Sequence, residues 1–155
     1  MRSRKARCNT SVDETRRYPL RPILGVGALI FDGSRILLAE RGKEPLKGYW
    51  SLPGGALETG ETLREGIRRE VLEETGLSVE PYEMAEVFER IIRDAQGRAE
   101  YHYVLMDFLC RVESGTPAPA DDASALRWVE VARLSELPLT EGTREVIERV
   151  YARLS

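Results

Sequence analysis

Three glutamates, Glu70, Glu73 and Glu74, are spaced so that they share one face of a helix. On a helical wheel they fall within an arc of about 100°. Like charges this close together are unfavourable unless something neutralises them. Mg2+ does so readily, because it prefers carboxylate oxygens, waters and substrate phosphates as ligands. The cluster therefore predicts either a metal site or a solvated acidic face, and these residues by themselves favour the solvated face.

Gly66 lies one turn earlier on the same arc. Glycine inside a helix costs about 1 kcal/mol relative to alanine, so its presence predicts that a ligand approaches the helix backbone here. On this interpretation, leucine at position 66 leaves folding unchanged or improved and reduces activity.

The spacing of the residues around the glutamates resembles the Nudix box, G-x5-E-x7-R-E-U-x-E-E-x-G-U. Gly55 is followed after five residues by Glu61, and after seven more by the run from Arg69 to Leu77, so every specified position is filled. The segment before the box, GYWSLPGG, is similar to the G-x-W-x-L-P-G-G that precedes it in the same family. The resemblance extends more loosely from about Pro22 to the end of the chain, and it shifts the balance to a metal site.

The resemblance implies the Nudix fold, an α/β/α sandwich with a mixed β-sheet, which would make the chain an α/β protein. It also implies a catalytic divalent cation, Mg2+ with Mn2+ as a substitute. By their places in the box, Glu70 and Glu74 match the principal metal ligands, and the carbonyl of Gly55 matches a further one. Glu73 matches a position that binds metal or supports the catalytic water.

Arg69 and Glu61 match a pair that braces the loop and the helix in this family, and Glu61 can also join the metal site. An arginine beside the acidic arc is suited to orient carboxylates through paired hydrogen bonds. We therefore expect Glu73, Glu70, Arg69 and Glu61 to form the catalytic set.

Metal-assisted attack of water on phosphorus also needs a carboxylate to accept the water proton. Nudix enzymes often use one outside the box, and Asp122 is the first candidate for this role and for a further metal ligand. Asp121 is the second candidate and Glu100 the third. A solvated acidic loop is an equally good interpretation of Asp121 and Asp122.

Arg41 and Tyr101 are the first candidates for binding substrate. Arg41 follows the second expected strand and could reach a phosphate, and Tyr101 could stack on a base, as could Tyr49 and Tyr103. A solvated arginine and packed tyrosines are the alternatives. His102 alternates with core residues and lacks a nearby nucleophile, so a core or pocket-wall position is favoured over catalysis.

Hydrophobic periodicity predicts the elements that must position these residues. The apolar run Ile23–Phe31 predicts a buried strand, Asp32-Gly33 a hairpin turn and Arg35–Glu40 the returning strand. Thr62 and Glu65 form a capping box and Gly76 a stop, which together predict a helix from Leu63 to Thr75. Later elements are expected as strands at Glu86–Arg93, Tyr101–Val112 and Leu126–Val131, a loop at Glu113–Ala123 and a helix at Glu141–Leu154. This order predicts a mixed sheet packed by helices.

Composition narrows the class of protein. The chain has 155 residues, 42% of them hydrophobic and 32% charged, which is typical of one folded domain. No apolar run approaches the roughly 18–20 residues that span a bilayer, so no membrane partner is expected. Cys8 and Cys110 are too few for a disulfide framework or a zinc site, and both suit a reducing cytoplasm.

Charge divides the chain into two parts. Residues 1–21 hold seven Lys/Arg and two acids, a formal charge of +5, so residues 22–155 carry −8 of the total of −3. We expect residues 1–21 to be a flexible basic leader outside the catalytic machinery and residues 22–155 to be the hydrolase domain. The acidic body argues against nucleic acid as a partner, and a homodimer is left open.

Within the family, the LPGGALETGE segment and the His102-Tyr103 strand look like the bacterial ADP-ribose pyrophosphatase branch. The proline found about sixteen residues past the box in many of those enzymes is missing, since that place is near Arg93. We therefore expect a small nucleotide substrate resembling ADP-ribose. A nucleoside-triphosphate pyrophosphatase acting on damaged dNTPs is the main alternative, and a Nudix-fold nucleotide sensor without turnover is a more distant one.

Overall fold

The computed structural model describes residues 16–119 and 123–155. Strands and helices follow one another along the chain in the order β1 (Ile23–Leu29), β2 (Phe31–Asp32), β3 (Arg35–Arg41), β4 (Trp50–Ser51), β5 (Gly54–Ala56), α1 (Leu63–Thr75), β6 (Ser78–Arg93), β7 (Ala99–Ser114), β8 (Ala123–Glu130), the 3-10 helix η1 (Val131–Glu136) and α2 (Thr143–Leu154). Within this part of the chain, no helix is both long enough and apolar enough to cross a membrane.

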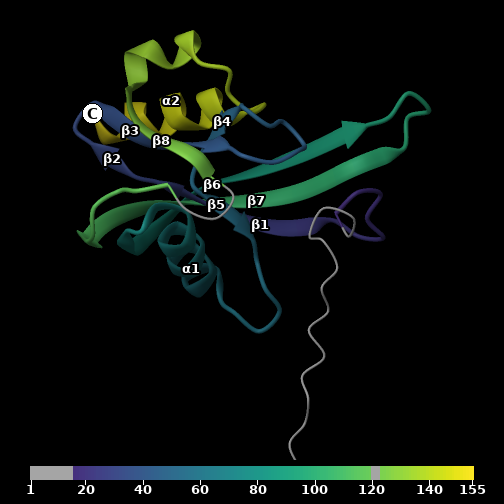
Figure 1. The fold of residues 1–155 in the computed structure, drawn as a ribbon, viewed down its shortest axis with the longest axis horizontal. Helices are drawn as coiled ribbons and strands as arrows, with labels where there is room; N and C mark the ends of the chain where they lie inside the picture. Colours follow the sequence, from purple (N-terminus) through teal and green to yellow (C-terminus); the bar gives the residue numbers. More distant parts are fainter. Residues whose placement is uncertain (1–15, 120–122) are drawn as a thin grey trace, which may run out of the picture.

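The strands form two sheets between the helices. One sheet has the order β5-β1-β7-β6, with β1 parallel to β7 and the other pairs antiparallel. In the second, β3 pairs antiparallel with β2, β4 and β8. Helices α1 and α2 lie on opposite sides of the strands (Figure 1). The predicted α/β fold with a mixed sheet packed by helices is confirmed.

Two hydrophobic clusters, one on each side, form the core. The first places Ile67 and Val71 of α1 against side chains from β1 and β7, among them Val26 and Phe108. The second places Val146, Ile147 and Val150 of α2 against side chains from β1 and β3, among them Leu29 and Leu38. Full burial of one such side chain stabilises the fold by about 1.5–3 kcal/mol. Cys110 is buried in the first cluster, as expected of a small core residue.

The local signals around α1 are confirmed. The Thr62 hydroxyl accepts from the backbone N–H of Glu65, and the Glu65 carboxylate accepts from that of Thr62 at 2.8 Å. Gly76 adopts the left-handed conformation, with φ of 74°, and donates to the carbonyl of Leu72. The helix therefore has the predicted bounds, Leu63 to Thr75.

Several other elements differ from the prediction. Strand β6 begins at Ser78 rather than Glu86, although Pro81 lacks the N–H that a ladder needs. The proline is accommodated because β6 is an edge strand and its register shifts between Pro81 and Glu83. Strands β7 and β8 are also longer than expected, and β4 and β5 were not predicted because both are very short.

Gly66 has a different role from the one predicted. It is buried, and a Cβ atom on it would lie 2.7 Å from Leu57 Cδ1 and 3.1 Å from Glu61 Oε1. The space above the glycine is therefore filled by the loop that precedes α1. The expectation that a ligand occupies this space is wrong, because the loop folds back over the first turns of the helix.

We predict that Gly66→Leu destabilises the protein. Helix propensity favours leucine by about 0.8–1 kcal/mol, but overpacking a filled site costs typically about 1–3 kcal/mol. Urea denaturation should show a lower free energy of unfolding than that of the wild type. A variant as stable as the wild type would show that the loop over the helix gives way at little cost.

Candidate active site

Arg69 lies at the centre of the acidic helix face. Its Nε and Nη2 donate to the two carboxylate oxygens of Glu61 at 2.9 and 2.5 Å. Its Nη1 donates to Glu70 at 2.8 Å and to Glu73 at 3.2 Å, and Nη2 also donates to the carbonyl of Ala56 at 3.1 Å. One guanidinium thus ties the loop before α1, strand β5 and the helix together.

The carboxylates around Arg69 have different electrostatic environments. The hydrogen bonds from Arg69 lower the pKa of Glu61, whose side chain is only 14% exposed. Burial raises the pKa of Glu70, and the hydrogen bond and charge of Arg69 oppose that shift. The pKa of Arg69 itself is raised, first by its hydrogen bond to Glu61. Glu61 and Arg69 therefore form a permanent ion pair, whereas burial disfavours the charge on Glu70.

Glu70 and Glu74 both lie against strand β5. The Glu70 carboxylate is so close to the backbone of Gly55 that a Cβ atom there would lie 2.5 Å from its Oε2. Gly54 donates its backbone N–H to Oε2 of Glu74 at 3.0 Å. A side chain at position 55 would push Glu70 away, so the glycine brings the helix carboxylates and the strand backbone together.

This donor set fits a hard divalent cation. Mg2+ is commonly held by one or two carboxylates, with waters and substrate phosphates completing its coordination. Glu70 and Glu74 provide carboxylate oxygens beside the Gly55 backbone, and a cation there would offset the cost of burying Glu70. Among the described residues, no three His, Cys, Asp or Glu side chains converge as a metal-binding cage. The residues present therefore fit a site that substrate helps to complete.

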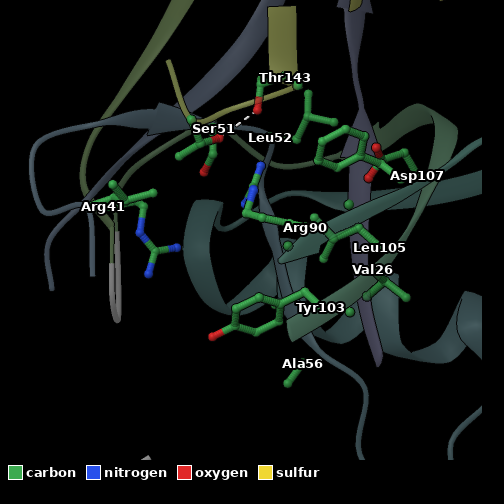
Figure 2. Close-up of a pocket in the computed structure, with 18 of the residues that line it drawn as sticks. Val26, Arg41, Ser51, Leu52, Ala56, Arg90, Tyr103, Leu105, Asp107 and Thr143 are labelled. Carbon is green, nitrogen blue, oxygen red and sulfur yellow. Dashed lines mark hydrogen bonds between the residues drawn. The ribbon is translucent and has the colours of Figure 1, made fainter. Parts of the chain in front are cut away.

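A cleft opens beside β5 and extends towards the start of α2. Its lining includes Gly54 and Gly55 from the box, together with the side chains of Arg41, Arg90, Tyr103, Asp107 and Thr143 (Figure 2). Arg41 Nε donates to the carbonyl of Pro45 at 2.8 Å, which directs the guanidinium along this wall. The expected phosphate-binding arginine and the box glycines thus line the same cleft.

Three charged residues that line the cleft were not predicted: Arg16, Arg90 and Asp107. Burial, and then the charge of Arg41, lower the pKa of Arg90. Arg90 Nη2 donates to the carbonyl of Glu141 at 2.6 Å, but its buried Nε finds no partner among the described residues. Burial raises the pKa of Asp107, 6% exposed, to about 6. A carboxylate inside the apolar stretch 105–110 of β7 was the available signal for Asp107.

The remaining candidates differ in their relation to the cleft. Tyr103 lines it, whereas Tyr101 stacks on Tyr103 with ring centroids 6.4 Å apart. Glu100 is paired with Arg17 at 2.9 Å. Asp121 and Asp122 lie outside the described residues, as do residues 1–15 of the expected leader.

Comparisons with known proteins show what the chain is similar to. A family model described as NUDIX domain matches residues 21–150. The ADP-ribose pyrophosphatase of Methanocaldococcus jannaschii is 34% identical over 137 residues, covering 88% of this chain and 77% of that protein.

Solved structures show the same fold. A MutT NUDIX hydrolase from Burkholderia pseudomallei is 34% identical, with a TM-score of 0.74 over 84% of this chain and 98% of the other. An ADP-ribose pyrophosphatase from Streptococcus suis is 27% identical, with a TM-score of 0.67 over 87% of this chain and 94% of the other.

We predict that Asp107→Asn makes stability less dependent on pH. The pKa of Asp107 is raised from 3.8 when unfolded to about 6 when folded, so the ionised form opposes folding. The wild type should gain about 2–3 kcal/mol relative to the variant as pH falls from 7 to 4. Chemical denaturation across this range measures the difference. A difference that stays constant with pH would contradict the assignment.

Proposed function

Because the chain belongs to the Nudix family, whose members hydrolyse nucleotide derivatives, we propose that it cleaves the pyrophosphate bond of ADP-ribose with the help of Mg2+. The observation that carries this proposal is the placement of Glu70 and Glu74 against the Gly54-Gly55 backbone at the edge of a cleft that holds arginines. The choice of ADP-ribose is supported by the 34% identity to an ADP-ribose pyrophosphatase.

We assign Glu70, Glu74 and the carbonyl of Gly55 as the metal ligands. A bound divalent cation neutralises pyrophosphate oxygens and lowers the pKa of a coordinated water. Glu70 and Glu74 come from one helix and Gly55 from the adjacent strand, so α1 and β5 hold the donors in a fixed relation. We also propose Asp122 as a further ligand of the metal.

The remaining box residues orient the site and support the catalytic water. Arg69 and Glu61 hold the helix against the loop and so fix the direction of Glu70. Glu73, with a side chain 46% exposed and paired with Arg69, is assigned to support the catalytic water, and Asp122 stays the first candidate to accept its proton. The water oxygen bonds to phosphorus as the bridging P–O bond breaks, and the products are AMP and ribose 5-phosphate.

Product analysis tests the substrate. Incubation with ADP-ribose and Mg2+ should yield AMP and ribose 5-phosphate in equal amounts. Release of inorganic pyrophosphate from dNTPs, without turnover of ADP-ribose, would instead identify a nucleoside-triphosphate pyrophosphatase.

We predict that Glu74→Gln lowers kcat for ADP-ribose by about a hundredfold or more, the scale seen when an electrostatic contact to the transition state is removed. Glu148→Gln is the matched control. It removes an exposed carboxylate from α2, which lies on the opposite side of the strands from α1. Steady-state kinetics with Mg2+ compares the two. A Glu74→Gln enzyme with kcat close to that of the wild type would rule out the metal assignment.

We predict that Arg41→Ala raises KM about tenfold and changes kcat less, because a ground-state phosphate contact contributes mainly to binding. Arg35→Ala is the control: it lies on the same strand, but its guanidinium pairs with Asp32 outside the cleft. An unchanged KM in Arg41→Ala would show that the substrate phosphates bind elsewhere.

A further inference from the structure

One residue that lines the cleft lies before residue 21, where the match to the family model begins. Arg16, seven residues before β1, lines the cleft together with Gly54, Gly55 and Arg41. Glu70 and Glu74 lie against the backbone of Gly55 and Gly54, so Arg16 shares the cleft with the proposed metal site. Within residues 16–119 and 123–155, nothing is hydrogen-bonded to the Arg16 guanidinium or forms an ion pair with it. It is therefore a half-buried cation with unused donors beside the proposed metal ligands.

The two residues after Arg16 hold this segment on the β6–β7 hairpin. Arg17 Nε donates to Glu100 Oε1 at 2.9 Å, and the backbone N–H of Tyr18 donates to the Glu100 carbonyl at 2.7 Å. The Tyr18 hydroxyl donates to Asp94 Oδ2 at 2.8 Å, and the Arg98 guanidinium lies 5.0 Å from the centre of the Tyr18 ring. We call residues 16–18 the strap.

The backbone of the strap adds a second observation. Tyr18 has a φ of 51°, in the left-handed region that side chains other than glycine rarely adopt. Such a conformation persists only where surrounding contacts hold it. The hydrogen bonds to Glu100 and Asp94 supply those contacts, so the chain direction at Arg16 is set by the hairpin rather than by solvent.

Arg16 completes a set of cations on the cleft wall. Arg41 comes from β3 and Arg90 from β6, and each of these already lines the cleft. Three arginines from three separate parts of the chain line this cleft, and Asp107 is the one carboxylate among its described lining residues. Guanidinium groups bind phosphate oxygens through paired hydrogen bonds, so this surface suits a ligand that carries several phosphate charges.

We propose that Arg16 is a substrate-binding residue, positioned by the strap to contact the phosphates of the nucleotide in the cleft. The proposal rests on the proposed function for its substrate, ADP-ribose. Arg16 binds the phosphate directly. Tyr18 is a positioning residue, since its hydroxyl faces Asp94 and its own side chain does not line the cleft.

Steady-state kinetics of Arg16→Ala in the full chain test whether Arg16 binds the substrate. We expect KM for ADP-ribose to rise about tenfold while kcat stays within about threefold, the pattern of a lost ground-state contact. Arg16→Lys should recover part of the loss, because lysine keeps the charge but not the paired geometry. Arg21→Ala is the matched control, an exposed arginine in the same segment that does not line the cleft. Equal KM values in Arg16→Ala and Arg21→Ala would overturn the proposal.

A double-mutant cycle tests the strap. Tyr18→Phe removes one hydrogen bond and should raise KM about two- to fivefold, but it should add little in an Arg16→Ala background, because both changes then act through the same guanidinium. Fully additive effects would show that Tyr18 does not act through Arg16. Melting temperatures of all variants separate loss of binding from loss of folding.

A binding measurement separates this proposal from the proposed function. Titration calorimetry of ADP in the presence of EDTA measures phosphate binding without metal and without turnover. Weaker binding by Arg16→Ala than by Arg21→Ala supports the role of Arg16 even if ADP-ribose is not hydrolysed. Equal binding by the two variants rejects that role even if ADP-ribose is the substrate.

Discussion

The two-point ion pair between Arg69 and Glu61 is the interaction on which the site depends. Glu61, Glu70 and Glu73 would repel one another if no cation lay between them, and the Arg69 guanidinium donates to all three. Arg69 also donates to the Ala56 carbonyl, so the same guanidinium is bonded to strand β5. Because the pair is largely shielded from solvent, its charges are less screened than those of a surface salt bridge. The loop before α1 is thereby held down on the helix, where it covers Gly66.

The order of strands in the sheet explains why the cleft forms beside Arg69 and its carboxylates. Strand β1 lies between β5, which contacts the box carboxylates, and β7, which carries Tyr103 and Asp107. Successive side chains of a strand point to opposite faces. Met106 and Phe108 of β7 therefore pack towards α1, while Tyr103 and Asp107 line the cleft. One strand thus contributes to the core with one face and to the cleft with the other.

The cleft also collects residues that are distant in sequence. Arg41 comes from the second sheet, Arg90 from the edge strand β6, and Arg16 from the segment before β1. The box carboxylates and the arginines of the cleft wall are therefore adjacent but held by different contacts. Arg69 holds the carboxylates, whereas contacts of the strands and of the β6–β7 hairpin hold the arginines. This separation suits an enzyme that must hold a cation and a polyanion side by side.

The sequence by itself determined those parts of this protein that depend on contacts between residues a few positions apart. The capping box at Thr62 and Glu65, the stop at Gly76 and the spacing of the box glutamates each involve contacts a few residues apart, so the bounds of α1 and the shared face of its glutamates could be predicted. Tertiary structure alone decided the rest. Pro81 is tolerated in a long strand because of its place at a bulge on a sheet edge, and Gly66 is required because a loop folds over it. Asp107, Arg90 and Arg16 line one cleft because segments distant in the sequence meet there, and such meetings leave no periodic signal in the residues themselves.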